Sequence, residues 1–371
     1  MSAGNSTFTW AHALHLHCTL SPFDSPLPNT HNAFAEVKAV SWKRLNIAGL
    51  LVTIYGLKEL PQDATEVTCL WLLHGRGDTQ DSMAYPAAAF LQAWNGRRRP
   101  GQKGLICVCI DQRNHGSRMV DNLANVSWSQ GNPTHAPDMF STFSGTASDI
   151  SHLIEQLPSY LPFKVTEHYC GGVSLGGHAT WQVMMNDPRV RAGLIIIGCP
   201  DYVRLMTDRA IRSEVPSCMS TDPPGKFFLG SQDFPPSLVA AVESHDPAGI
   251  LLGELDVVIP GSDHLHTPSP TEKDRLRSII SERLSGKNIL CLSGGEDRLV
   301  PYKCGEPFLT WLKKAIDPKS GWCNDMGITL EDVVDPKARH EFSAPMREKA
   351  EKWLLDLLSS DDVPMVRESK I

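Results

Sequence analysis

The stretch that most constrains the fold is YCGGVSLGGH at 169–178, in which four glycines surround Ser174. An apolar run precedes it and a helix-like segment follows it, so the serine is expected at the apex of a sharp turn between strand and helix. In the pattern G-x-S-x-G the serine has a strained backbone and stands clear of the sheet. Side chains at 172 and 176 would collide with the neighbouring strand and helix, which explains the glycines. The pattern predicts a nucleophilic Ser174; the alternative is a glycine-rich turn with an incidental serine.

Short apolar runs alternate with helix-like segments along most of the chain, and a polar loop is expected over residues 112–144. The expected strands are residues 50–55, 67–73, 104–110, 166–171, 190–197, 288–292 and 329–334. The expected helices are residues 82–94, 146–161, 176–185, 306–316 and 345–358. Strands that are apolar on both faces and separated by helices indicate an α/β fold with a mostly parallel central sheet and helices on both faces.

Three regions are expected from the pattern. Residues 1–35 show no sustained periodicity of apolar residues and are predicted to form an N-terminal arm. Residues 36–200 and 286–371 are predicted to form the α/β core. Residues 201–285 contain helical pieces among many prolines and are too long for a simple connection, so we expect an inserted cap or lid. Candidate substrate walls in this segment are Tyr202, Phe227, Phe228 and Phe234, although ordinary packing explains them equally well.

A serine nucleophile needs a base to take its proton, and the base needs an acid that fixes its tautomer. In strand-turn-helix sites of this kind, the acid and then the histidine follow the serine along the chain. The run LSGGEDRLVP at 292–301 offers Asp297, with Glu296 as the rival carboxylate, and the D-x-x-V-P spacing favours Asp297. His340 is the only histidine after Asp297 in the sequence, so it is the predicted base.

Two backbone amides are expected to bind the developing oxyanion. Leu175 begins the helix after the nucleophile, where free N–H groups point at the site. Arg76, in LHGRGD at 73–78, is expected to supply the second amide, because the flanking glycines allow close backbone approach. The Arg76 side chain is either a ligand for an acidic substrate or a solvent-facing partner of Asp78. His74 is predicted to support this loop.

Other polar residues near these motifs carry weaker signals. Ser117 lies beside His115, but the segment is expected to be a loop ordered by hydrogen bonds. Cys170 is expected to be buried and inert, and His178 to pack within its helix, although it could also line the site.

Composition excludes several classes of function. A net charge of −7 and a pI near 6.0 give no attraction for nucleic acid. The chain shows neither a signal-like start nor an apolar run that could span a bilayer, which predicts a cytoplasmic protein. The ten cysteines lack CxxC spacing and are expected to be buried thiols. His12, His15, His17 and Cys18 have no second ligand cluster, so no metal is expected.

With these motifs in place, the chain resembles the α/β-hydrolase superfamily over roughly residues 36–360. LHGRGDT is similar to a loop of acyl-protein thioesterases and carboxylesterases. The D-x-R-x-H-G segment at 111–116, GGVSLGGH, GGEDRLVP and the late His340 resemble fungal hydrolases near the dienelactone hydrolase and prolyl oligopeptidase groups. Some relatives of that kind are associated with secondary metabolism.

The resemblance implies Ser174 as nucleophile, Asp297 as acid, His340 as base, and Arg76 and Leu175 as oxyanion donors. Around the base, this chain has ARHE at 338–341 where many relatives have G-H-E or G-H-x. We therefore predict a serine hydrolase that cleaves a small ester or thioester through an acyl-enzyme, without metal or organic cofactor. The alternatives are a biosynthetic acyl transferase, a peptidase, and a non-catalytic interaction protein on a hydrolase scaffold.

Overall fold

The computed structural model describes residues 21, 37–253, 265 and 267–360. The predicted N-terminal arm therefore lies outside the described residues, apart from Ser21. The same holds for the His12–Cys18 group, for residues 254–264 of the predicted cap, and for the C-terminal segment 361–371.

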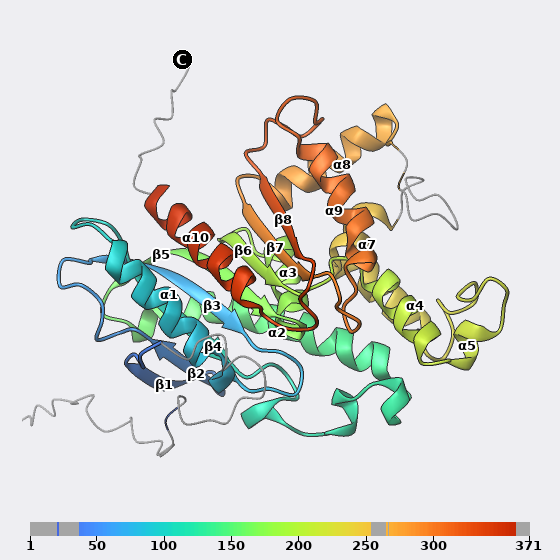
Figure 1. Ribbon diagram of the computed structural model, residues 1–371, viewed down its shortest axis with the longest axis horizontal. Coiled ribbons are helices and arrows are strands. Elements are labelled where there is room, and N and C mark those ends of the chain that lie inside the picture. The colour runs from blue at the N-terminus through green and yellow to red at the C-terminus, as the bar shows by residue number, and fades with distance from the viewer. Residues whose placement is uncertain (1–20, 22–36, 254–264, 266, 361–371) are drawn as a thin grey trace, which may run out of the picture.

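One sheet of eight strands forms the centre of the described protein, as Figure 1 shows. Its spatial order is β1-β2-β4-β3-β5-β6-β7-β8. The strands are β1 (Trp42–Ile47), β2 (Leu50–Tyr55), β3 (Glu66–Leu73), β4 (Gly104–Ile110), β5 (Lys164–Val173), β6 (Val190–Ile196), β7 (Asn288–Gly294) and β8 (Thr329–Asp335). All pairs from β4 to β8 are parallel, whereas β1 with β2 and β2 with β4 are antiparallel. The predicted mostly parallel sheet is confirmed.

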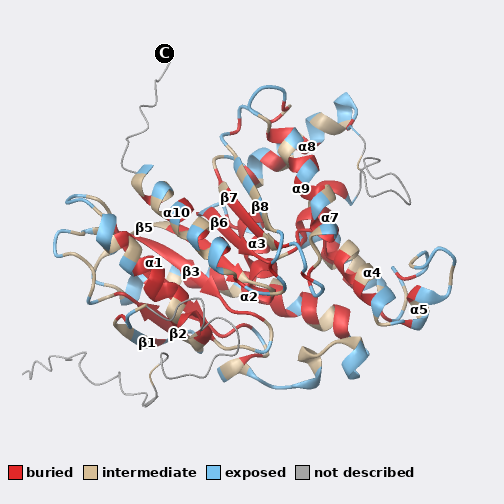
Figure 2. Cartoon of the chain, in the orientation of Figure 1, coloured by how far each residue is buried: buried red, intermediate tan, exposed pale blue. Residues whose placement is uncertain are grey.

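Helices cover both faces of the sheet. One face carries α1 (Ala84–Arg97) and α10 (Ala344–Ser360), and the other carries α2 (His135–Gln156), α3 (Leu175–Asn186), α8 (Pro270–Leu284) and α9 (Tyr302–Ile316). Successive side chains of strand β3 are buried under opposite helical layers. Leu70 and Leu72 are buried on the side of α1 and α10, whereas Cys69 and Trp71 are buried on the other side. Figure 2 shows the strands buried between the two helical layers. A sheet covered on both sides needs apolar residues at successive positions, which is the pattern in the sequence.

Two elements differ from the sequence prediction. Strand β1 was not expected; it pairs with β2 across a tight turn at Ala48 and Gly49, whose φ angles are 51° and 83°. Helix α2 begins at His135 rather than at residue 146, so the predicted loop over 112–144 is shorter than expected. The added turns bury Ala136, Met139, Phe140 and Phe143 in the core, and this packing outweighs the weak helix propensity of the local sequence.

Between β6 and β7 the described chain is helical. It contains α4 (Tyr202–Arg212), α5 (Pro216–Met219), α6 (Pro236–His245) and α7 (Pro247–Leu252), followed by α8. Helix α4 contacts α9, and α6 and α7 pack together. This stretch coincides with the predicted cap at 201–285, whose role as a cap stays a prediction.

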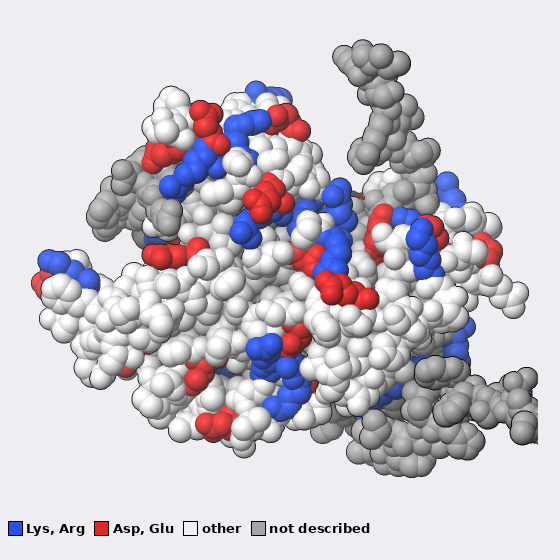
Figure 3. Space-filling model, turned by 180° about the vertical axis from the view of Figure 1, so that it is seen from behind, with Lys and Arg blue, Asp and Glu red and all other residues white. Residues whose placement is uncertain are grey.

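None of the helices in the described ranges is long and apolar enough to cross a membrane. Figure 3 shows acidic and basic atoms side by side over one face of the molecule. The cysteines that the structure describes are buried and outside any disulfide, as the sequence predicts.

Candidate active site

Ser174 occupies the turn between β5 and α3. Its φ of 56° and ψ of −111° are unusual for a residue with a side chain, and it is followed directly by the first residue of α3, Leu175. The Ser174 amide donates to the carbonyl oxygen of Ile196, at the end of β6, over 2.9 Å. The neighbouring strand thus fixes the strained turn and keeps the hydroxyl above the sheet.

The glycines around Ser174 are required by close backbone packing. A Cβ on Gly172 would collide with the backbone of Gly176, and a Cβ on Gly176 would collide with the carbonyl groups of Leu73 and His74. A Cβ on Gly177 would lie 2.9 Å from the carbonyl oxygen of Ile196. Helix α3 therefore begins in direct contact with the ends of β3 and β6, which allows the sharp turn.

The three residues predicted to act together form one hydrogen-bonded chain. His340 Nε2 lies 2.8 Å from Ser174 Oγ, and His340 Nδ1 lies 2.7 Å from Asp297 Oδ2. The side chain of Asp297 is fully buried, and its Oδ1 accepts from the amides of Leu299 and Val300 over 2.8 and 2.9 Å. With Nδ1–H donating a hydrogen bond to the carboxylate, Nε2 is the acceptor for the serine hydroxyl.

Of the two neighbouring carboxylates, the loop places Asp297 against His340. Glu296 is 58% exposed and forms an ion pair with Arg339 at 3.7 Å. The two loops are joined by the Glu296 amide, which donates to the Ala338 carbonyl over 3.0 Å. A Cβ on Gly294 would lie 2.6 Å from that same carbonyl oxygen, so the glycine allows the histidine loop to approach β7.

A cavity of about 110 Å³ opens beside Ser174. It is lined by Arg76, Met139, Ser174, Leu175, Arg209, Leu299, Val300 and His340. These residues come from the loop after β3, from α2, α3 and α4, and from the loops after β7 and β8. The site therefore lies at the carboxyl edge of the parallel strands, where ligands bind in open α/β sheets.

The structure brings both predicted oxyanion donors to this cavity. Leu175 is at the start of α3, where the first N–H groups of a helix have no partner within the helix. Arg76 lies in a turn closed by the Asp78 amide, which donates to the Gly75 carbonyl over 3.3 Å, and Gly77 takes a φ of 84°. A Cβ on Gly75 would be 4.0 Å from Ser174 Cβ, so this turn passes close to Ser174.

His74 holds the Arg76 loop from within the protein. Its Nδ1–H donates to the Gly75 carbonyl over 2.7 Å, and its Nε2 accepts from the Gln112 amide over 3.0 Å. Burial lowers the pKa of His74 to about 4, so the ring is neutral, as this pattern of donor and acceptor requires. Gln112 also donates its side-chain amide to the His74 carbonyl.

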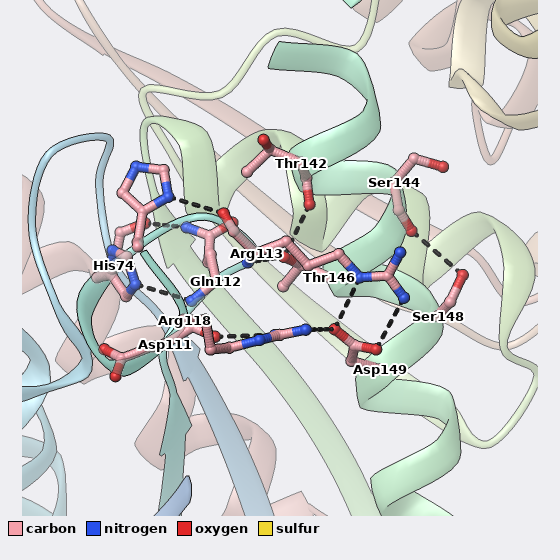
Figure 4. A network of polar contacts seen from close by, with 11 residues as sticks. His74, Asp111, Gln112, Arg113, Arg118, Thr142, Ser144, Thr146, Ser148 and Asp149 are labelled. Atoms are coloured by element: carbon pink, nitrogen blue, oxygen red, sulfur yellow. Dashed lines mark hydrogen bonds and ion pairs between the residues drawn. The ribbon is translucent and has the colours of Figure 1, made fainter. Parts of the chain in front are cut away.

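The segment after β4 ties this loop to α2, as Figure 4 shows. Arg113 and Arg118 both bind the carboxylate of Asp149 on α2, with contacts of 2.8–3.1 Å. Ser117 donates its hydroxyl to Asp111 over 2.7 Å. The segment thus orders the loops around the site, in agreement with the sequence interpretation of Ser117.

The predicted substrate walls lie elsewhere. The Tyr202 hydroxyl donates to the Ala136 carbonyl over 2.6 Å inside the core, Phe228 is buried against Phe234, and Phe227 is exposed. The structure does not bring Tyr202, Phe227 or Phe228 to the cavity beside Ser174. Aromatic character alone does not distinguish core packing, as at Tyr202 and Phe228, from an exposed position, as at Phe227, or from a substrate wall.

Two further candidates from the sequence, His178 and Cys170, are buried inside the protein. His178 is buried and accepts from the Cys199 amide over 3.1 Å, which fixes α3 against the loop after β6. Burial lowers its pKa to about 3 and raises the pKa of the Cys170 thiol to about 12. Neither side chain lines the cavity.

Sequence reasoning missed four cavity residues: Met139, Arg209, Leu299 and Val300. Leu299 and Val300 lie two and three residues after the predicted acid, and Met139 lies in a segment that was expected to be a loop. Arg209 did carry a signal, because it falls on the same face of α4 as the buried Tyr202, Leu205 and Met206. A cation within an apolar helix stripe indicates a buried polar role.

Residues 72–354 match the model of the family described as "Alpha/beta hydrolase family". No curated protein matches the sequence. Similar solved structures include a Thermus thermophilus protein, with 15% identity over 86% of this chain and 99% of that one and a TM-score of 0.48.

Two further solved structures are similar at the same level. An S-formylglutathione hydrolase from Agrobacterium tumefaciens shares 15% identity over 86% of this chain and 94% of that one, with a TM-score of 0.47. The acylaminoacyl peptidase of Pyrococcus horikoshii shares 13% identity over 89% of this chain, with a TM-score of 0.47, but this match spans only 43% of the peptidase.

Proposed function

Because the chain belongs to the alpha/beta hydrolase family, we propose that it is a serine hydrolase that cleaves a small ester or thioester through an acyl-enzyme. The observation that supports this most strongly is the continuous chain from Asp297 through His340 to Ser174, with heavy-atom distances of 2.7 and 2.8 Å. A base and a nucleophile within hydrogen-bond reach, with the base oriented by an acid, are the requirements of nucleophilic catalysis.

In the first half of the reaction, His340 Nε2 takes the hydroxyl proton while Ser174 Oγ attacks the carbonyl carbon. Asp297 stabilises the resulting imidazolium through the bond to Nδ1–H. The carbonyl oxygen becomes an oxyanion, which the amides of Leu175 and Arg76 bind. When the tetrahedral intermediate collapses, His340 gives its proton to the leaving alcohol or thiol and the acyl group stays on Ser174.

In the second half, water loses a proton to His340 and attacks the acyl-enzyme. The acid product leaves and the Ser174 hydroxyl is restored. An alcohol or amine in place of water would give acyl transfer with the same residues, and an amide substrate would give peptidase activity. A place in secondary metabolism stays a prediction of the resemblance to fungal hydrolases.

We also propose that the segment 201–285 acts as a cap over this site. The support is Arg209 of α4, which lies within that segment and lines the cavity. An inserted segment that contributes a side chain to the cavity beside Ser174 is suited to determine which substrates enter that cavity.

The test compares wild type with Ser174→Ala on p-nitrophenyl esters and on acyl thioesters. We expect kcat to fall by at least about 10³-fold, because the nucleophile is lost. Equal turnover in the two proteins would contradict the proposal. Product formed faster with an added alcohol or amine would indicate a transferase, and wild type without any turnover or fluorophosphonate labelling would indicate a non-catalytic scaffold.

A further inference from the structure

Two guanidinium groups line the cavity beside the nucleophile. Arg209 on α4 is only 7% exposed. Arg76 is half-buried, and its Nη1 atom is fully buried without a hydrogen-bond partner. The proposed mechanism uses the backbone amide of Arg76 but neither of these side chains.

Neither guanidinium has a carboxylate partner among the residues that the structure describes. Arg209 instead donates to three uncharged acceptors: His135 Nε2 at 2.9 Å, Met139 Sδ at 3.0 Å and the Leu299 carbonyl at 2.9 Å. Burial, together with the charge of Arg209, lowers the pKa of His135 to about 3, so this ring is neutral. The surroundings of Arg209 therefore provide hydrogen bonds but no negative charge.

Asp78, the partner that the sequence offers for Arg76, does not neutralise it. Burial raises the pKa of Asp78, and the described structure contains no ion pair between the two side chains. The two arginines also repel each other: burial and then the nearby charge of Arg76 lower the pKa of Arg209 to about 10. Arginine keeps its charge in proteins, and a buried charge without a counterion is costly.

We propose that the substrate carries a carboxylate near its scissile carbonyl and that the side chains of Arg76 and Arg209 bind it. This inference rests on the proposed hydrolase function. Planar guanidinium groups match a carboxylate with two parallel hydrogen bonds, which makes arginine suited to this anion. Ser174 and His340 line the same cavity of about 110 Å³. The bound anion therefore has to lie within a few bonds of the reacting carbonyl.

Arg76 would then have two separate functions in the same turn. Its backbone amide faces the oxyanion, while its side chain faces the carboxylate of the acyl group. The substrate class is therefore the half-ester or half-thioester of a short dicarboxylic acid.

The experiment compares three ethyl esters that differ only at the far end of a short acyl chain. Monoethyl succinate carries a carboxylate, ethyl 4-methylpentanoate is its uncharged isostere, and ethyl 3-phosphonopropanoate carries a phosphonate. In wild type we expect kcat/KM for the succinate ester to exceed that for the isostere by about 10- to 100-fold, the range for hydrogen bonds to charged groups.

Arg209→Gln and Arg76→Gln should each lower this preference ratio by about tenfold or more. The ratio compares two substrates of one protein, so partial loss of folded enzyme does not change it. The matched control is Arg97→Gln, which removes an exposed arginine at the end of α1 and should leave both rates unchanged. A second measurement needs no variant: succinate should slow fluorophosphonate labelling of wild type, whereas succinamide should not.

The outcomes separate this inference from the proposed function. If wild type cleaves the uncharged ester as fast as the succinate ester, the anion site is overturned while the hydrolase stands. A preference for the phosphonate overturns the carboxylate assignment. An unchanged ratio in both arginine variants overturns their role. If no ester is cleaved and no label is incorporated, the proposed function fails and this inference fails with it.

Discussion

At the scale of single residues, the backbone at Ser174 shows how the site is prepared before substrate binds. A φ of 56° costs free energy for a residue with a Cβ, on the order of 1–3 kcal/mol. The bond from the Ser174 amide to Ile196 and the start of α3 hold this conformation in place. The hydroxyl therefore points at His340 without any rearrangement, which is the arrangement that efficient nucleophilic catalysis requires.

The neighbouring carboxylates Asp297 and Glu296 provide a matched pair of variants. Asp297→Asn is expected to lower kcat about 10⁴-fold, because an amide at this position no longer fixes the Nδ1–H tautomer of His340. Glu296→Gln changes an exposed carboxylate that does not contact His340, so its kcat should equal that of wild type. Ester turnover measures both. Full activity in Asp297→Asn would refute the assignment of the acid.

The three residues of the proposed triad could be brought together from sequence because their types and order along the chain single them out. Ser174 lies between two glycines at the spacing G-x-S-x-G, and His340 is the only histidine after Asp297 in the sequence. Arg209 could not be assigned to the site in the same way. It reaches the cavity because α4 brings its guanidinium against α2 and the loop after β7, where it bonds His135, Met139 and Leu299, and no local pattern encodes these contacts.

At the scale of elements, the contact between α3 and β3 depends on Gly176. Gly176→Ala would force its Cβ into the carbonyl groups of Leu73 and His74, so α3 has to move. We expect the free energy of unfolding in urea to fall by about 1–3 kcal/mol, with loss of ester turnover. The control is Gly96→Ala near the end of α1, where a Cβ has free space. That variant should keep its stability or gain up to about 1 kcal/mol. Equal stability of the two variants would contradict this packing.

Two buried carboxyl groups cap neighbouring helices and should make stability depend on pH. Asp201 accepts from the Arg204 amide at the start of α4, and Asp246 accepts from the Gly249 amide at the start of α7. Burial raises the pKa of Asp201 to about 6, despite Arg204, and burial together with Asp201 raises the pKa of Asp246 well above its usual range. A folded-state pKa above the unfolded value gives stability at low pH that is lost as the pH rises through about 6.

Asp201→Asn removes this titration and keeps an oxygen that can cap α4. Between pH 5 and pH 8, the free energy of unfolding of the variant should therefore rise relative to wild type by on the order of 1 kcal/mol. Urea unfolding at the two pH values measures the difference. A constant difference between the proteins, or a shift in the opposite direction, would contradict the raised pKa.

The elements that sequence reasoning misplaced share a physical cause. Strand β1 lies at the edge of the sheet, and only two of its six residues, Leu45 and Ile47, are buried, so it lacks the continuous apolar run of the central strands. The first turns of α2 contain Pro137, Ser141 and Thr142, which are weak helix formers. In both cases tertiary packing decides the structure, and such packing is not visible in a local window.

At the scale of the whole molecule, the site lies where the carboxyl edge of the sheet meets α2 and α4. The fold itself could be predicted, because alternating strands and helices leave few arrangements. The size of the cavity could not be predicted from the sequence, since Met139 and Arg209 line it from segments far apart along the chain. At about 110 Å³ it is smaller than ordinary ligand pockets.

This small cavity predicts a preference for short acyl groups. Among p-nitrophenyl esters from acetate to octanoate, kcat/KM should fall at least about tenfold for the longest chains, because they do not fit beside Ser174. Met139→Ala enlarges the cavity and should move the optimum to longer chains, whereas Met219→Ala changes an exposed methionine and should not. A wild-type enzyme that prefers octanoate would contradict the size of the cavity.

The most direct test of the central claim is the site of covalent reaction with a fluorophosphonate. Wild type should gain one adduct, which peptide mass spectrometry should locate on Ser174, and His340→Ala should react at least about 10³-fold more slowly. An adduct on another residue, or equal labelling of Ser174→Ala, would contradict the proposed nucleophile.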